Sequence, residues 1–153
     1  FIIMSWVPHI TVASIVEKDN KFLFVEEYVK DNIVLNQPAG HLEENETIEE
    51  GCIRETLEET ACLVKVDHLI GIYQERKKGA LDMWLRFCFK CTVKKEYTDR
   101  KLDKNIIRKI WLTKEEVLRP ERILRSDMVI KCINDFEAGK KYPKEIINSL
   151  LEK

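Results

Sequence analysis

One segment, residues 40–59, constrains this chain more than any other, because it concentrates carboxylates at a spacing that a helix can aim at one point. It reads Gly40-His41-Leu42-Glu43-Glu44-Asn45-Glu46 and, after seven residues, Arg54-Glu55-Thr56-Leu57-Glu58-Glu59. Such a cluster is typical of a divalent-metal site for phosphate chemistry. Magnesium fits best, since this hard ion prefers oxygen ligands and commonly bridges carboxylates to substrate phosphates. The alternative is a solvated run of surface charge, as most charge runs are.

The second part of the segment is predicted to be helical. Residues 47–62 contain no proline, and Asn45 or Thr47 can cap the start of the helix. Ile53 and Leu57 are expected to supply the apolar face that holds this helix on the core.

The carboxylates are predicted to share the opposite face. At about 100° per residue, Glu58 lies roughly 60° to one side of Glu55 and Glu59 roughly 40° to the other. Like charges at this spacing destabilise an isolated helix by about 0.2–0.5 kcal/mol per pair, and a bound cation would offset that cost.

Length and composition limit the classes of protein to which this segment can belong. The chain has 153 residues, of which 44% are hydrophobic and 35% charged, so one globular domain over residues 4–153 is expected. The 26 Lys and Arg residues nearly balance the 27 Asp and Glu residues. A formal charge of -1 gives no basic field for nucleic acid or an anionic membrane, so neither is expected as a partner.

The start of the chain and its cysteines suggest a cellular compartment. Phe1-Ile2-Ile3-Met4 is apolar but lacks a basic leader and a long hydrophobic run, so it is read as neither a signal peptide nor a membrane span. Met4 is a candidate natural start, with residues 1–3 added before it. The five cysteines form an odd set, which argues against a complete disulfide framework and favours the reducing cytoplasm.

Cys88 and Cys91 have the spacing of half a redox or zinc site, but no second half-site accompanies them. They fall in a strand-like run, where positions three apart point to opposite faces. The two sulfurs are therefore expected to diverge and to pack in the core.

The remaining elements predict an α+β fold. Strands are expected over residues 10–16, 21–26, 33–36, 64–74, 83–93 and 106–112, and helices over 47–62, from 113 onward and over 124–137. Residues 17–20 form a turn signal that makes the first two strands a hairpin, and Arg76–Gly79 reads as a polar hairpin connection. Strands on both sides of a central helix, with helices at the end, favour a sandwich over an alternating βαβ fold.

The register of Gly40, Glu46, Arg54, Glu55, Glu58 and Glu59 resembles the box of the Nudix hydrolases. The resemblance implies an α/β/α sandwich with a mixed central sheet, in which the box forms a loop-helix-loop. It also implies hydrolysis of a nucleoside diphosphate linked to another moiety, or of a related pyrophosphate, with Mg²⁺ or Mn²⁺. Two box positions depart from the pattern, because Thr56 stands where an aliphatic residue is usual and Ala61 where glycine is usual.

The same resemblance implies the metal ligands. Glu55 and Glu59 match the ligands of the first metal, Glu58 a further or water-mediated ligand, and the Ala39 carbonyl the remaining position. Gly40 would let the loop backbone approach the metal.

Catalysis is expected to be attack of water on phosphorus, assisted by the metal. Arg54 and Glu46 match residues that orient the carboxylates through charge-assisted hydrogen bonds. Glu55 is the first candidate for the base. Asp103, before the last strand, is a second candidate, although it reads equally well as a solvated loop residue.

Beyond the box, the chain resembles one subgroup of bacterial Nudix phosphatases. The stretches that carry this likeness are Pro8-His9-Ile10-Thr11-Val12-Ala13, Asn36-Gln37-Pro38-Ala39-Gly40-His41-Leu42-Glu43, Leu85-Arg86-Phe87 and Tyr142-Pro143. It implies action on hydroxymethylpyrimidine diphosphate, thiamine diphosphate and nucleoside di- and triphosphates, with release of orthophosphate. Leu35 departs from the tryptophan usual in that subgroup, which would alter substrate preference if that ring stacks on a base.

Candidate substrate contacts lie outside the helix. Arg86 could reach a phosphate, Gln37 and Trp84 could contact a heterocycle, and His41 could approach a phosphate beside the metal. Each also has an ordinary reading, as a paired arginine, a core-edge residue or a solvated histidine. His9 and His68 lie in apolar strand contexts, and no catalytic role is expected for either.

Other functions stay open at this point. One is a pyrophosphohydrolase acting on a nucleotide sugar or a dinucleoside polyphosphate. Another is a Nudix module that senses a nucleotide without cleaving it, although such modules usually have broken boxes and this chain retains all four acids. The oligomeric state is expected to be a monomer or a small homo-oligomer.

Overall fold

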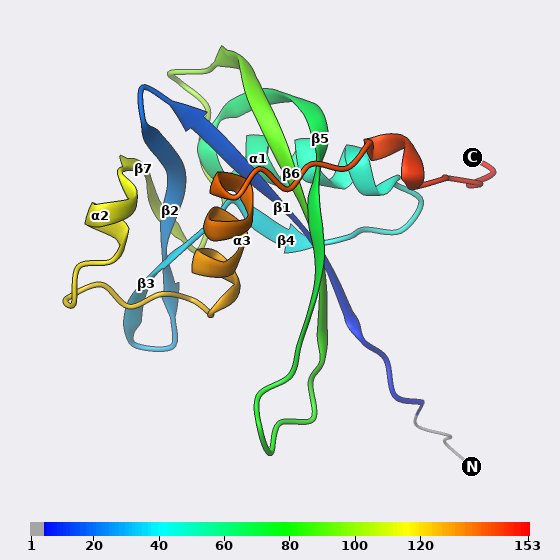
Figure 1. Ribbon diagram of the computed structural model, residues 1–153, viewed down its shortest axis with the longest axis horizontal. Helices are drawn as coiled ribbons and strands as arrows, with labels where there is room; N and C mark the ends of the chain where they lie inside the picture. Colours follow the sequence, from blue (N-terminus) through cyan, green and yellow to red (C-terminus); the bar gives the residue numbers. More distant parts are fainter. Residues whose placement is uncertain (1–4) are drawn as a thin grey trace.

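A computed structural model describes residues 5–153, so the expectations for Phe1–Met4 concern residues outside the described range. The elements are β1 (His9–Lys18), β2 (Lys21–Val29), β3 (Asn32–Asn36), β4 (Ala39–His41), α1 (Ile48–Thr60), β5 (Cys62–Glu75), β6 (Trp84–Glu96), β7 (Ile106–Leu112), α2 (Lys114–Val117), α3 (Met128–Glu137) and the 3₁₀ turn Lys144–Ile146. Their order and arrangement confirm the predicted α+β fold (Figure 1). Among residues 5–153, no helix has the length and apolar character needed to cross a membrane.

The strands form one mixed sheet of seven strands in the order β3-β2-β1-β6-β5, with β4 added to β1 and β7 added to β2. The predicted hairpin exists only at its turn, where Glu17 pairs with Phe22. Beyond that point β1 leaves β2 and runs antiparallel to β4 and parallel to β6. Strand β1 therefore joins the two halves of the sheet.

Two hydrophobic cores lie on opposite faces of this sheet, and each is covered by a helix (Figure 1). Cys52 of α1 packs with Val12 in one core, while Cys132 of α3 packs with Ala13 in the other. Cys88 belongs to the α3 side and Cys91 to the α1 side. The two sulfurs diverge into separate cores, as the strand spacing predicted.

Helix α1 has well-defined ends. Thr47 is the N-cap: its side chain accepts the Glu50 N–H, and the Glu50 side chain accepts the Thr47 N–H. Of the two predicted caps, Asn45 is therefore not the one used. At the other end Ala61 adopts a left-handed conformation with φ of 59°.

The face by which α1 packs differs from the expected one. Ile53 and Leu57 are only partly buried, whereas Cys52 and Thr56 are fully buried against the sheet. The buried hydroxyl of Thr56 bonds to the Cys52 carbonyl at 2.8 Å and to the Ser14 hydroxyl at 2.9 Å. Small side chains let the helix approach the sheet, and the Thr56 hydroxyl is satisfied there.

Two further differences come from tertiary pairing. The short strand β4 was not expected, because three residues give no periodic signal and its partners lie in β1. Residues 124–127 are not helical, since Leu124 instead forms a bridge with Leu35, and the helix begins at Met128.

Candidate active site

Strand β4 and helix α1 together position the first carboxylates. The backbone N–H of Ala39 donates to Oε1 of Glu59 at 2.9 Å, which fixes that side chain against the strand. Glu59 is 7% exposed, and its burial raises its pKa to about 9. Ionisation of this buried carboxylate is costly on its own and becomes favourable when a cation lies beside it.

A second group of acids, which does not include Glu59, is formed by two side chains of α1 and one from the loop before β7. Oxygen atoms of Glu55, Glu58 and Asp103 all lie within 4.8 Å of one another. Asp103 reaches the helix because its backbone N–H donates to the Glu58 carbonyl at 3.0 Å. Burial also raises the pKa of Glu55, and the nearby Arg54 opposes that shift. We call Glu55, Glu58, Glu59 and Asp103 the carboxylate cluster.

Arg54 connects the cluster to the loop before the helix. Its Nε and Nη2 donate to both oxygens of Glu46 at 2.8 and 2.7 Å. Its Nη1 donates to Glu55 at 2.7 Å and to Glu58 at 3.1 Å. The Arg54 guanidinium holds the pKa of the Glu46 carboxyl below its usual range. The Glu46 carboxylate in turn raises the pKa of Arg54. These bonds fix the orientation of three carboxylates, those of Glu46, Glu55 and Glu58, before any ligand binds.

Gly40 lies directly over the cluster. A Cβ at this position would lie 2.2–2.4 Å from the carboxylate atoms of Glu55, closer than any real contact. Glycine therefore provides the space in which the Glu55 carboxylate sits.

The donor set matches a hard divalent cation. Every group in the cluster offers carboxylate oxygen, and burial makes two of the acids, Glu55 and Glu59, costly to ionise without positive charge nearby.

A cavity of about 380 Å³ adjoins the cluster through β4. Its walls are formed by residues from six strands, from the start of α3 and from the connecting segments: Thr11, Glu27, Tyr28, Asn36, Ala39, Gly40, His41, Glu75, Lys77, Trp84, Arg86, Asn105, Arg125, Ser126 and Met128. Of the four predicted substrate contacts, Arg86, Trp84 and His41 line it. Gln37 does not, because it is fully buried behind Arg86, whose Nη1 donates to the Gln37 amide oxygen at 2.9 Å.

Aromatic and imidazole rings gather on one wall of this cavity. The rings of His41 and Trp84 have centroids 5.4 Å apart, and His9 stacks on Trp84 at 4.2 Å. Nδ1 of His9 lies 3.0 Å from Nε2 of His41. Burial lowers the pKa of His41, and the neighbouring His9 lowers it further. This wall suits the flat face of a ring.

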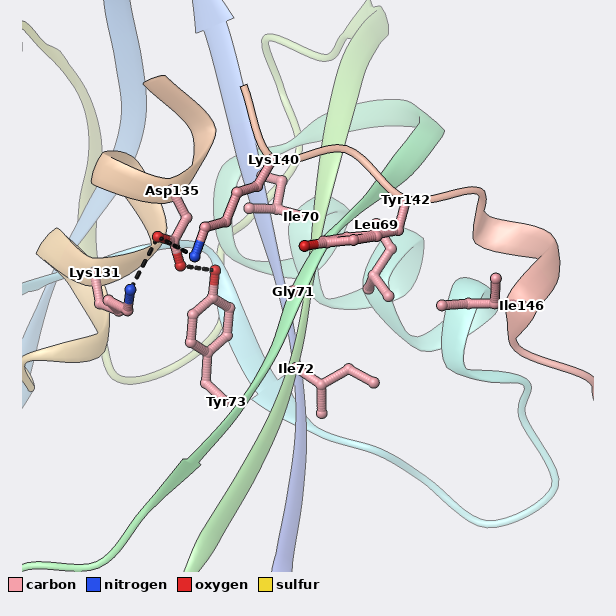
Figure 2. Close-up of a pocket in the computed structure, with 10 residues that line it drawn as sticks. All are labelled: Leu69, Ile70, Gly71, Ile72, Tyr73, Lys131, Asp135, Lys140, Tyr142 and Ile146. Carbon is pink, nitrogen blue, oxygen red and sulfur yellow. Dashed lines mark hydrogen bonds and ion pairs between the residues drawn. The ribbon is translucent and has the colours of Figure 1, made fainter. Parts of the chain in front are cut away.

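A second cavity, of about 430 Å³, lies beside β5 and α3 (Figure 2). Its polar groups already bind one another: Tyr73 donates to Asp135 at 2.8 Å, and Lys131 and Lys140 pair with the same carboxylate at 2.9 and 3.1 Å. The cavity next to the carboxylate cluster is the better candidate for the active site.

Sequence reasoning missed several lining residues. Thr11 and Asn36 lie in stretches that resemble the phosphatase subgroup, but neither was singled out as a substrate contact, and Arg125 lies in no recognised motif. The pairing of Thr11 with Arg86 across β1 and β6 is what places Thr11 in the cavity wall.

A mixed sheet between two helices, with carboxylates on a capped helix beside a ligand-sized cavity, agrees with the hydrolase class that the sequence resembles. The NUDIX domain model matches residues 7–131, and the chain belongs to the Nudix family. The predicted membership of the Nudix family, the α+β fold and the hydrolase activity are confirmed.

The relatives narrow the family further. The chain is 36% identical over 140 residues to Phosphatase NudJ of Shigella boydii, which covers 92% of this chain and 90% of that protein. The NudJ of Escherichia coli K12 matches to the same extent. A solved NUDIX hydrolase from Nitrosomonas europaea superimposes with a TM-score of 0.90 at 41% identity, over 94% of this chain and 97% of that one. The chain is a homologue of the NudJ phosphatases.

Proposed function

We propose that the protein hydrolyses a phosphoanhydride bond in a small diphosphate or nucleotide, with Mg²⁺ bound by the carboxylate cluster. The observation that carries this proposal is the position of the cluster, which adjoins a cavity of about 380 Å³. Mn²⁺ is an alternative ion, because it accepts the same oxygen donors.

The proposed substrates are hydroxymethylpyrimidine diphosphate, thiamine diphosphate and nucleoside di- and triphosphates, with release of orthophosphate. The likeness to NudJ, which is named as a phosphatase, supports this choice. The ring-lined wall at Trp84 and His41 would accept the flat organic part.

The chain's own residues account for the steps of the reaction. Glu55, Glu58 and Glu59, with the Ala39 carbonyl, would hold the cation, and Arg54 and Glu46 would fix the orientation of these acids. The bound ion supplies positive charge that stabilises phosphoryl oxygens and makes a water easier to deprotonate.

Glu55 is proposed to take the proton from the attacking water, because its carboxylate lies with those of Glu58 and Asp103 at the proposed metal position. Asp103 is the second candidate, since one of its oxygens lies within 4.8 Å of an oxygen of Glu55. As the water oxygen bonds to phosphorus, the bridging P–O bond breaks and its electron pair leaves with the departing group.

The deciding experiment offers the purified protein a panel of diphosphates with Mg²⁺ and follows the products by phosphorus NMR. The panel holds hydroxymethylpyrimidine diphosphate, thiamine diphosphate, nucleoside triphosphates, a nucleotide sugar and a dinucleoside polyphosphate. Orthophosphate from the first three, lost in EDTA and in Glu59→Gln, is the expected result. Turnover by Glu59→Gln at the wild-type rate would refute the proposed ligand set.

The same panel tests the alternatives. Cleavage of only the nucleotide sugar or the dinucleoside polyphosphate would make the protein a pyrophosphohydrolase of that compound. Tight binding with no turnover of any member would make it a nucleotide-sensing module.

We further propose that the protein works in the cytoplasm. All five of its cysteines are free and buried, which suits a reducing compartment. Fractionation of the source cells, followed by detection with an antibody, tests this location.

A further inference from the structure

Three buried side-chain polar atoms in residues 5–153 have no hydrogen-bond partner: Oγ1 of Thr11, Oδ1 of Asn36 and Nε of Arg86. All three residues line the cavity beside the carboxylate cluster. We call them the polar floor of that cavity. Buried polar groups are normally paired, so three orphans in one cavity indicate partners that arrive with a ligand.

Arg86 is the most telling of the three. Its side chain is 7% exposed, and its Nη1 donates to the neutral amide of Gln37 at 2.9 Å. No carboxylate within residues 5–153 forms an ion pair with it, so its guanidinium has no acidic partner in direct contact. A buried charge without a counterion is costly.

The other two cations of the cavity differ in this respect. Nζ of Lys77 lies 3.0 Å from Asp127 and 3.8 Å from Glu75, and Arg125 lies 4.0 Å from Glu27. Both already have acidic partners. An incoming anion would therefore gain most at Arg86.

Strand pairing places a hydroxyl beside this guanidinium. Thr11 and Arg86 are direct partners in the parallel pair β1–β6, and neighbours in register point to the same face. His41 is the partner of Thr11 on the other side, in β4. A guanidinium N–H and a hydroxyl side by side are donors that suit phosphoryl oxygens.

The cavity is connected to the carboxylate cluster, which is the proposed metal-binding end of the site. Ala39 and Gly40 line it, and the same two residues contact Glu59 and Glu55. One ligand can thus lie along β4, with one end at the carboxylates and the other at the floor.

We propose that Thr11 and Arg86 bind a phosphoryl group of the substrate that is not the one held at the metal. This inference rests on the proposed function and assigns a place to the second phosphoryl group of its substrates, at the end of the cavity away from the metal. Asn36 donates from Nδ2 to Glu27 at 3.3 Å, and its free amide oxygen is left to accept from a donor on the organic part of the substrate.

Calorimetric titration of inorganic pyrophosphate in EDTA tests this subsite without turnover. Wild-type protein is expected to bind, Arg86→Gln to bind about 10- to 100-fold more weakly, and Arg86→Lys and Thr11→Val to fall between them. Arg108→Gln, at a surface arginine paired with Glu26, serves as the matched control that keeps wild-type affinity.

Thermal unfolding of the same variants provides a second measurement. Removal of a buried charge without an acidic partner in direct contact is expected to leave the melting temperature of ligand-free Arg86→Gln at or above that of wild type. Pyrophosphate is expected to raise the melting temperature of wild type but not of Arg86→Gln.

Turnover with Mg²⁺ then separates this subsite from the metal site. Arg86→Gln is expected to raise KM for a diphosphate about 10-fold or more, with a smaller change in kcat, because the contact is made before the reaction. Arg86→Lys, which restores the charge, should recover part of the lost affinity.

Three results would overturn the proposal: no binding of pyrophosphate by wild type in EDTA, equal binding by Arg86→Gln, or an equal loss of affinity for an uncharged nucleoside in that variant. An equal loss of affinity for the nucleoside would mean that Arg86 contacts the ring of the substrate and not a phosphoryl group. If no diphosphate is hydrolysed but binding still depends on Arg86, the proposed function fails while the subsite stands.

Discussion

The carboxylate cluster and the polar floor meet at strand β4, and their polar groups are held in opposite ways. In the cluster, Glu55 and Glu58 accept from Arg54, and Glu59 accepts from the Ala39 backbone. In the floor, one polar atom of each residue has no partner within residues 5–153.

The protein itself orients the carboxylates of the cluster, whereas the unpaired atoms of the floor obtain their partners from a ligand. The cluster is preorganised by hydrogen bonds inside the protein, so changes there are expected to act on metal binding and kcat. The floor is completed by the ligand, so changes there are expected to act on substrate affinity. Variants at each end can break this distinction or sharpen it.

The largest effect is expected for Glu55→Gln, which removes charge at the centre of the cluster. Loss of a metal ligand should lower kcat more than about 100-fold, since even residues behind a ligand typically contribute 10- to 100-fold. Pyrophosphate binding in EDTA should not fall, because the floor is intact. Steady-state kinetics and calorimetry measure the two quantities, with the exposed Glu44→Gln as control. A loss of metal-free binding equal to the loss of kcat would abolish the distinction between the two ends.

Asp103→Asn should follow, with kcat or Mg²⁺ affinity lowered about 10- to 100-fold. The reason is that its carboxylate lies within 4.8 Å of Glu55 and Glu58, although it comes from a different loop. Metal titration of activity measures this effect, and the exposed Asp99→Asn is the matched control from the same loop. Wild-type behaviour of Asp103→Asn would mean that Asp103 is a solvated loop residue with no part in metal binding or catalysis.

Arg54→Lys is expected to lower Mg²⁺ affinity about 10-fold while the protein stays folded. Lysine keeps the charge but lacks the fork that binds both oxygens of Glu46 and reaches Glu55 as well. Metal titration detects the change, and circular dichroism checks the fold. Unaltered metal affinity would show that charge alone, without orientation, suffices at this end.

The smallest effect is expected at Ala61, which belongs to neither end. A left-handed conformation costs alanine about 1–2 kcal/mol, which glycine would not lose. The greater freedom of glycine in the unfolded chain cancels about half of the resulting gain in the free energy of unfolding. Ala61→Gly should therefore raise the melting temperature by about 1–4 °C and leave both KM and kcat unchanged. A lower melting temperature would mean that packing of the buried methyl group outweighs its backbone strain.

The two ends also differ in how far the sequence revealed them. The cluster lies mostly on one helix, where the spacing of Glu55, Glu58 and Glu59 fixes their direction, so a local pattern was enough. Asp103 joins them through a backbone bond to Glu58, and no spacing along the chain announces that contact.

The floor depends on strand register, which is a tertiary property. Arg86 was recognised as a candidate, but its partner Thr11 lies 75 positions away and is brought near only by the parallel pairing of β1 and β6. For the same reason Gln37, expected to contact a heterocycle, lies behind Arg86 instead. The strands themselves were predictable from their apolar runs, whereas the short β4 was not.

The closeness of Gly40 to Glu55 has a genetic consequence. Any missense change in a glycine codon adds at least one carbon, and here that carbon would occupy the place of the Glu55 carboxylate. Because the displaced atoms end a flexible side chain, the altered protein would still fold and accumulate. Natural selection is therefore expected to guard this codon as strictly as those of the acids, although glycine itself performs no chemistry. A population survey would find alleles there depleted without any sign of protein loss.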